Sequence, residues 1–518
     1  SFNVFFTAGC SIGLVRQWYE VPLEKIGFSL SSNDDFLSSN YKYVPFTKGG
    51  TFRRWYGNLE SVVDWTNPNT MHRPRTTYMN LYYKPAITWN AICSGKLSCR
   101  FYDRGFLFEH AAASLFVNND YQFESFLAYL NTPVFQFILS ILNPTLNTGA
   151  EVVSSIPIII PSSGIHQKIH QNISISKQDW DAHETSWDFQ TNELIQLSID
   201  GVGHIQATIN EKTIQDYYSI ELLLTEYKTK WEDLFNRLHA NEEELNRQFI
   251  EIYGLQDELT SDVPLNEITI LQQGEISIEG DKLRWNDDVL MKQLISYAVG
   301  CMMGRYSIDR PGLILANQGD SQKEYEALVP NSRFAIDDDG IIPLMSANTE
   351  FTDNITLRFK TWLGITFGEE SLMDNLNFIE RSLGKRLDDY FVKDFWKDHK
   401  KMYQNRPIYW LFSSKKGSFQ CIAYMHRMNA YTAEKIRANY LLPHIEWLFN
   451  KQNEMQANAA NLSTRERKEL DSIGKQIEEC REYHDRLHVV ADQQIGFDLD
   501  DGVVVNYAKF GDVLAKLK

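Results

Sequence analysis

The sequence predicts an α+β fold in which a mixed, strand-rich first part is followed by a predominantly helical second half. Short β-type runs separated by Gly, Asn and Pro turns dominate up to about Pro161. Beyond that position Glu, Gln, Lys and Leu become common, and apolar residues recur at helical spacing. The chain has 518 residues, of which 43% are hydrophobic and 23% charged, a composition typical of globular protein with room for roughly three domains.

The first part is expected to contain several strands and a pair of helices. The strands are predicted at residues 41–46, 86–92, 106–108, 114–117 and 156–160. Helical apolar spacing covers residues 123–130. Thr132 followed by Pro133 predicts the N-cap and first turn of a second helix, which ends at Asn143-Pro144.

In the second half, helical patterns cover residues 215–259, 287–303, 374–401 and 465–487, with a break at Asp262-Val263-Pro264 and a loop-rich interval near 337–340. Residues 406–416 are predicted to form a core strand followed by a basic loop. These changes in composition and pattern divide the chain into four predicted regions. They are a first domain at 1–161, a helical spacer at 162–265, a helical or mixed domain at 266–430, and a helical segment and tail at 431–518.

One interval of the chain is strongly basic. Ten of the twelve Lys and Arg residues in the first 110 positions fall between Lys42 and Arg104, against three acids, so this interval carries about +7 while the whole chain carries −17. Lys and Arg neutralise phosphates, and aromatic side chains stack on bases, so the interval predicts a nucleic-acid-binding surface. The candidate contact residues are Lys48, Arg53, Arg54, Trp55, Tyr56, Arg73, Arg75, Lys84, Trp89, Arg100 and Arg104.

A second interpretation of this interval is equally open at this point. The aromatic residues could form the core of a strand-rich domain whose charges are merely solvated, and Trp55 and Trp89 in particular favour core positions because Trp is highly buried on average. A protein-interaction or scaffold subunit, with a basic surface that binds an acidic partner, would have the same composition. Sequence-dependent DNA affinity separates these alternatives.

No motif for a catalytic or metal centre stands out. The chain lacks GxxxxGK[ST], HExxH and GxSxG motifs and a glycine-rich dinucleotide turn. A methyltransferase acting on a base amine would need an Asn/Asp-Pro-Pro-Tyr/Phe loop, and the nearest match, Asn143-Pro144-Thr145-Leu146, lacks the second proline and the aromatic. Histidine pairs at 166/170 and 484/488 have no third ligand. We therefore assign no catalytic and no metal-ligating residue.

The cysteines and apolar stretches bear on the compartment. Six scattered cysteines without a CxxC pair favour reduced thiols. The longest apolar runs are too short to span a bilayer. A cytoplasmic protein without a membrane partner is therefore expected.

A series of strings resists generic explanation: WYEV (18–21), KGG (48–50), FRRWYGN (52–58), ITW (87–89), NPTLN (143–147), KQDWDAHETSWDF (177–189), NEEELNRQFIEIYGLQDEL (241–259), YAVGCMMGRYSIDRPGLILANQ (297–318), RPIYWLFSSKKGSF (406–419) and DDGVVVNYAKF (500–510). In this order the strings resemble segments of the BREX-type adenine-specific DNA methyltransferases, the PglX or BrxX family. The resemblance covers nearly the whole chain.

This resemblance implies the target-recognition region and C-terminal half of such an enzyme, without its catalytic domain. S-adenosylmethionine is then expected only for that absent domain, and this chain alone is not expected to be catalytic. The implied partners are double-stranded DNA, other BREX proteins and a DNA-mimicking phage inhibitor. Residues 7–15, TAGCSIGLV, depart from the family's usual approach to Trp18, as expected of a truncated or recombined gene copy.

Overall fold

The computed structural model describes residues 13–68, 76–109, 111–117, 120–143, 145–159, 161, 164–209, 212–346 and 349–517. The chain forms two compact units. Unit 1 comprises Ser1–Trp18, Leu23–Phe189 and Thr225–Asn286, and unit 2 comprises Tyr19–Pro22, Gln190–Leu224 and Asp287–Lys518. The predicted domain boundaries stay predictions, and most of the unusual 7–15 junction lies outside the described residues.

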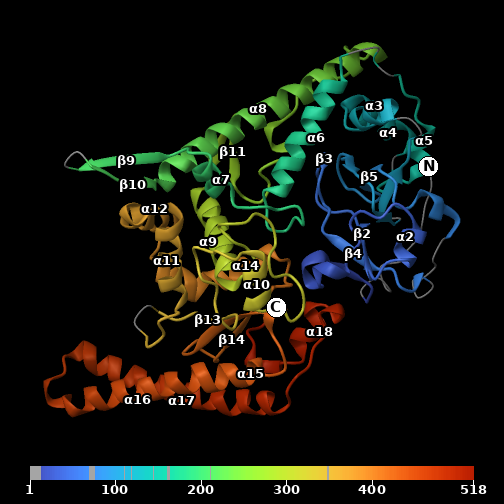
Figure 1. The fold of residues 1–518 in the computed structure, drawn as a ribbon. Coiled ribbons are helices and arrows are strands. Elements are labelled where there is room, and N and C mark those ends of the chain that lie inside the picture. The colour runs from blue at the N-terminus through green and yellow to red at the C-terminus, as the bar shows by residue number, and fades with distance from the viewer. Residues whose placement is uncertain are drawn as a thin grey trace. The chain divides into compact units, whose positions relative to one another are not determined.

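Unit 1 contains two four-stranded sheets (Figure 1). The first has the order β1-β4-β2-β7, antiparallel except for the parallel pair β2 and β7. Its strands are β1 (Val15–Gln17), β2 (Tyr43–Thr47), β4 (Ser61–Asp64) and β7 (Leu107–Phe108). Val44 and Val63 face each other across β2 and β4, and both are fully buried. They belong to a core that also includes Trp65 and Tyr82, so the aromatics of this interval do form core.

The second sheet has the order β3-β6-β5-β8, in which β3 and β6 are parallel. Its strands are β3 (Trp55–Tyr56), β5 (Ala86–Asn90), β6 (Arg100–Tyr102) and β8 (Ala112–Leu115). Strand β5 lies between β6 and β8 and pairs with both in antiparallel register. β5 is thus an interior strand of this sheet, and its last residue is the polar Asn90.

Helices and a hairpin complete unit 1. They are α2 (Asn33–Leu37), α3 (Asp120–Leu130), α4 (Pro133–Leu142), α5 (Ala150–Ser155), α6 (His166–Asp181), the part of α8 (Ile220–Tyr253) from Thr225 onward, β11 (Ile276–Glu279) and β12 (Lys282–Trp285). The Thr132 hydroxyl accepts a hydrogen bond from the Phe135 N–H at 3.4 Å, which confirms the predicted N-cap of α4. Helix α6 lies against β3.

Unit 2 is mainly helical and includes a small antiparallel sheet of order β13-β15-β14. Trp410 in β14 and residues 294–303 of α9 are buried. The elements are α7 (Glu193–Ile199), β9 (His204–Ile209), β10 (Lys212–Tyr218), α9 (Asp287–Met303), α10 (Gln322–Leu328), β13 (Ile341–Pro343), α11 (Ile355–Phe367), α12 (Leu372–Leu383), α13 (Leu387–Tyr390), α14 (Trp396–Met402), β14 (Tyr409–Ser413), β15 (Gln420–Tyr424), α15 (Thr432–Lys435), α16 (Leu442–Ala457), α17 (Thr464–Asp492) and α18 (Val503–Ala508).

The structure confirms the α+β class and most long helical patterns, with two corrections. Strand β10 occupies the start of the pattern predicted as helix over 215–259, and helix α8 begins only at Ile220. Residues 156–159 form no strand, contrary to prediction. There the Tyr253 hydroxyl donates to the Pro157 carbonyl and accepts from the Ile159 N–H, so these backbone groups are satisfied without a β-ladder.

Among the described helices, no single one is long and apolar enough to cross a membrane, although α3 and α4, bent by 72° to each other, meet the length and composition criteria as a pair.

Gly105 provides a sharp test of the close packing in unit 1. Its φ is +94°, and a Cβ atom there would lie 2.3 Å from the Phe28 carbonyl oxygen, a backbone atom that cannot rotate away. We expect Gly105→Ala to lower the free energy of unfolding by roughly 2–4 kcal/mol, from backbone strain and overpacking together. Urea denaturation measures this loss.

Gly254→Ala is the matched control for this variant. Gly254 has a similar positive φ of +66°, but a Cβ atom there meets nothing within 4 Å. Only the backbone strain remains, and the expected loss is about 1 kcal/mol. Equal losses in the two variants would contradict a steric role for the Phe28 carbonyl.

Candidate nucleic-acid interface

Three of the predicted contact residues are exposed cations on unit 1. Lys48 follows β2, Lys84 precedes β5, and Arg104 follows β6. Arg73 and Arg75 lie outside the described residues. Lys48, Lys84 and Arg104 are thus located at strand ends, where the two sheets do not cover their side chains.

Lys84 and Arg104 lie on adjoining turns. The Tyr83 N–H donates to the Phe106 carbonyl at 2.9 Å, and the Gly105 N–H donates to the Tyr83 carbonyl at 3.1 Å. These two hydrogen bonds hold the turn that carries Lys84 against the turn that carries Arg104. A pair of neighbouring cations on firmly held turns is suited to contacts with successive phosphates.

The other six predicted contact residues are buried: Arg53, Arg54, Trp55, Tyr56, Trp89 and Arg100. Arg54 is 6% exposed and makes two ion pairs, one with Glu242 of α8 and one with Glu267 at 2.9 Å. The indole N–H of Trp55 donates to the second oxygen of Glu242 at 2.7 Å. One carboxylate therefore holds both side chains in the interior.

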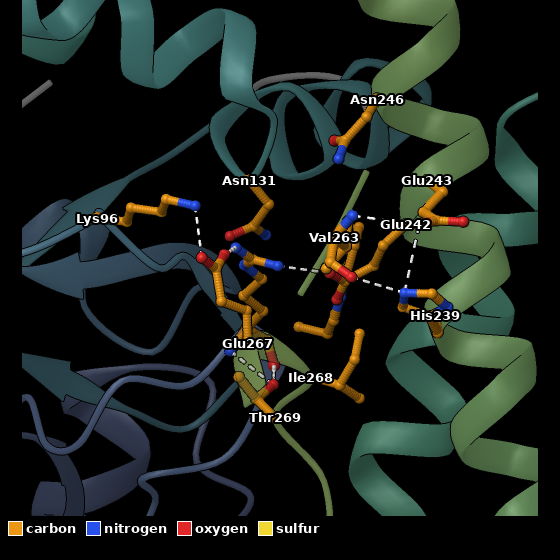
Figure 2. Close-up of polar contacts among 12 residues, drawn as sticks. Lys96, Asn131, His239, Glu242, Glu243, Asn246, Val263, Glu267, Ile268 and Thr269 are labelled. Atoms are coloured by element: carbon orange, nitrogen blue, oxygen red, sulfur yellow. Dashed lines mark hydrogen bonds and ion pairs between the residues drawn. The ribbon is translucent and has the colours of Figure 1, made fainter. Parts of the chain in front are cut away.

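The network around Arg54 extends to the surface through Glu267. Burial opposes ionisation of Glu267, but the hydrogen bond from Lys96 and the charges of Arg54 and Lys96 keep its pKa below the usual value. Figure 2 shows Lys96 approaching Glu267 on one side, and Glu242, Glu243 and His239 projecting from α8 on the other. Lys96, whose side chain is 54% exposed, is the only one of the two cations here that meets solvent.

Arg53 belongs to a second buried network. Its guanidinium pairs with Asp179 of α6, donates to the Tyr56 carbonyl at 2.9 Å and stacks over the Trp180 ring. The other oxygen of Asp179 accepts from the Leu271 N–H at 2.7 Å. Arg53 therefore joins the start of β3 to α6 and to the segment that follows Glu267.

Tyr56 and Trp89 also have protein partners. The Tyr56 hydroxyl accepts from the Lys177 ammonium at 3.3 Å, and burial raises the pKa of this tyrosine to about 12. The Trp89 indole N–H donates to the Thr148 carbonyl at 2.9 Å. Both rings are core elements in this structure, as the second interpretation of the sequence expected for Trp89.

Arg53 and Arg54, two of the residues predicted to contact DNA, are buried and paired with carboxylates in this structure. To face a duplex, either guanidinium would have to leave buried carboxylates, at a cost of several kcal/mol. The sequence did not reveal these carboxylates because they lie 126 to 213 positions away in the chain. The sequence analysis did not single out Asn90, a half-buried polar residue at the end of β5 that directly follows the string ITW.

Comparison with known proteins shows which proteins this chain is similar to. No family model matches the chain. Over an alignment of 534 positions it is 34% identical to the adenine-specific methyltransferase BrxX of Escherichia coli O9:H4 (strain HS), covering 97% of this chain and 42% of the relative. The chain is homologous to part of the BrxX/PglX adenine-specific methyltransferases.

A second member of that family gives the same result. The adenine-specific methyltransferase PglX of Lacticaseibacillus casei (strain Zhang) is 34% identical over 97% of this chain and 41% of the relative. The resemblance to the BREX-type PglX/BrxX family is thereby confirmed. The chain spans about two fifths of the length of these relatives.

In this BrxX/PglX homologue, Glu242 should be essential to the stability of unit 1. Glu242→Ala leaves Arg54 with one ion pair and Trp55 without its hydrogen bond, in a buried site. We expect the free energy of unfolding to fall by roughly 3–5 kcal/mol. Glu251→Ala, which removes an exposed partner of Arg247 on the same helix, should cost less than about 1 kcal/mol. Similar values for the two variants in urea denaturation would refute a structural role for the Arg54 network.

His183 makes the stability of unit 1 depend on pH. Its ring nitrogens lie 2.7 Å from the Asp179 carbonyl oxygen and 2.6 Å from a Glu275 carboxylate oxygen, so both donate and the ring is cationic. Burial opposes protonation, but the charge and hydrogen bond of Glu275 outweigh it and raise the pKa of His183. This pair therefore stabilises the fold below the usual histidine pKa, and its contribution is lost as the pH rises through the raised value.

The test compares wild type with His183→Gln, which cannot be protonated. The wild type should have its largest stability advantage over the variant at about pH 6, and this advantage should fall as the pH rises through the raised pKa of His183. Chemical denaturation over a series of pH values from about pH 6 upward gives the free energies of unfolding of both proteins. A difference between the proteins that is the same at every pH value would rule out a charged His183.

Proposed function

We propose that unit 1 is the DNA target-recognition module of a BREX-type adenine-specific methyltransferase. One observation carries this proposal: Lys48, Lys84 and Arg104 are exposed within a strongly basic stretch of an acidic chain that is homologous over 97% of its length to adenine-specific methyltransferases. Lys48, Lys84 and Arg104 are the described contact candidates, and Arg73 and Arg75 join them from the same stretch.

The mechanism of recognition follows from how charge is divided between the interior and the surface. Phosphate contacts from exposed cations set the position and register of the duplex, and base-edge contacts then select the sequence. Arg53, Arg54, Trp55 and Tyr56 support the strand ends that carry these contacts. Their ion pairs and hydrogen bonds stay within the protein, so binding DNA costs little reorganisation.

Methyl transfer and S-adenosylmethionine binding are assigned to the part of the relatives that the aligned region does not cover. The proposed partners are double-stranded DNA, other BREX proteins and an acidic, DNA-mimicking phage inhibitor that would bind the same basic surface. Cys93, Cys99, Cys301, Cys421 and Cys480 are all free thiols, which fits a cytoplasmic location.

Selection from a randomised duplex pool at near-physiological salt tests the proposal. The full 518-residue chain should enrich one sequence motif. The double variant Lys84→Ala/Arg104→Ala should weaken binding to all sequences, with a salt slope lower by about 1 per lost phosphate contact and the same motif. Arg53→Ala/Arg54→Ala would report on folding and not on DNA contact, because both guanidiniums are buried in ion pairs.

Lys282→Ala is the control, because Lys282 is an exposed cation on β12 of the same unit. It should leave affinity and motif unchanged. Binding without enrichment would overturn sequence recognition and favour the scaffold alternative, in which the basic surface binds an acidic protein. Absence of binding by the wild type would overturn DNA recognition by this chain.

A further inference from the structure

Arg100 differs from the other two buried arginines of unit 1. It is 2% exposed, and its one hydrogen bond runs from Nη2 to the Asn90 side-chain oxygen at 3.2 Å. Its Nε and Nη1 atoms are buried without a hydrogen-bond partner among the described residues, whereas Arg53 and Arg54 each pair with a carboxylate. Burial lowers the pKa of Arg100 to about 10, which still leaves it protonated at neutral pH. A cation is thus held next to Asn90 without an ion pair among the described residues.

Asn90, the last residue of β5, is half-buried, and both ends of its amide are held by hydrogen bonds. Its oxygen accepts from Arg100, and its NH2 group donates to the Gly50 carbonyl at 2.6 Å. These partners determine the orientation of the amide, since the guanidinium only donates and the carbonyl only accepts. The oxygen keeps one lone pair and the nitrogen one N–H for a ligand. Asn90 is therefore a preorientated donor and acceptor pair on the surface.

Residues 48–50 form one side of this site. A Cβ atom at Gly49 would lie 3.1 Å from the Asn90 oxygen, and one at Gly50 would lie 2.5 Å from the Asn58 side chain. This segment can approach Asn90 closely because Gly49 lacks a side chain. Lys48, at the start of the segment, is exposed. An exposed ammonium group is thereby carried by the same segment that fixes Asn90.

Two exposed aliphatic side chains form the other side. Ile92 is 74% exposed and lies two positions beyond Asn90. Leu146 is 63% exposed and is joined to this strand end by a hydrogen bond from the Cys93 N–H to the Leu146 carbonyl at 3.0 Å. A cation, an amide and two aliphatic side chains are therefore carried by segments that meet at the carboxyl end of β5.

We infer that the surface at this end of β5 reads an adenine in the major groove of duplex DNA through Asn90. This inference rests on the proposed function. An asparagine amide matches adenine, because its oxygen accepts from N6 and its nitrogen donates to N7. Lys48 contacts a neighbouring phosphate, and Ile92 packs against an adjacent base, where a thymine methyl group is the best apolar partner. Arg100 is a positioning residue that keeps the Asn90 oxygen turned toward it.

The test uses the motif selected by the wild-type chain and follows the preference at each position. Asn90→Ala should lose the preference for one adenine, by roughly 5- to 150-fold in relative affinity, and keep the others. Replacing that adenine by 7-deazaadenine, which lacks the N7 acceptor, should weaken the wild type but not Asn90→Ala. Lys48→Ala should weaken binding to all duplexes equally. Arg100→Lys keeps the charge but not the planar fork, and should reduce the preference at the same adenine as Asn90→Ala.

Gln167→Ala is the matched control, since it removes an exposed amide from α6 of the same unit and should change neither affinity nor motif. An Asn90→Ala chain that selects the wild-type motif with unchanged preferences would overturn this inference and leave the proposed function standing. A uniform loss on all sequences would also overturn it, because Asn90 would then touch the backbone of the duplex. If the wild type selects no motif, both proposals fall.

Discussion

The arrangement of unit 1 depends on the contacts that the Glu242 carboxylate makes. It accepts hydrogen bonds from Arg54 and from Trp55, two consecutive residues at the start of β3. Trp55 has a φ of +68°, a left-handed conformation that is uncommon for a bulky residue and costs about 1–3 kcal/mol. The Glu242 contacts and the Trp55 N–H bond to the Cys99 carbonyl hold this conformation, and the parallel pairing of β3 with β6 follows from it.

The buried and exposed cations of unit 1 fall into distinct roles because of what faces them. Arg53 and Arg54 pair with carboxylates from α6, α8 and the segment near Glu267, so their charges are neutralised inside the fold. Lys48, Lys84 and Arg104 remain at strand ends in contact with solvent. Arg100 belongs to neither group, because it is buried and its described partner is an amide. The partner of each cation, and not the local density of Lys and Arg, therefore distinguishes the cations that stabilise the fold from those that face solvent.

Local sequence patterns predicted the elements that local forces determine. The helix at 287–303 agrees with α9, and Thr132-Pro133 predicted the start of α4, because helical spacing and capping involve neighbours in the chain. Long-range contacts were out of reach. Residues 156–159 have the composition of a strand, but the Tyr253 hydroxyl, from the distant helix α8, bonds to the Pro157 carbonyl and the Ile159 N–H. The resemblance to the PglX/BrxX family was predictable because it rests on strings in order, whereas the burial of Arg53 and Arg54 depends on partners far along the chain.

The separation of Arg54 and Glu242 along the sequence has a consequence for how the protein folds during synthesis. They are separated by 188 positions, so at about 5–20 residues per second a ribosome needs roughly 10–40 s to synthesise the partner carboxylate after the arginine. During this interval the guanidinium must stay hydrated, and β3 lacks the contacts that hold its left-handed residue. The two sheets of unit 1 therefore reach their final form only after residues 190–224, which belong to the other unit, have been synthesised.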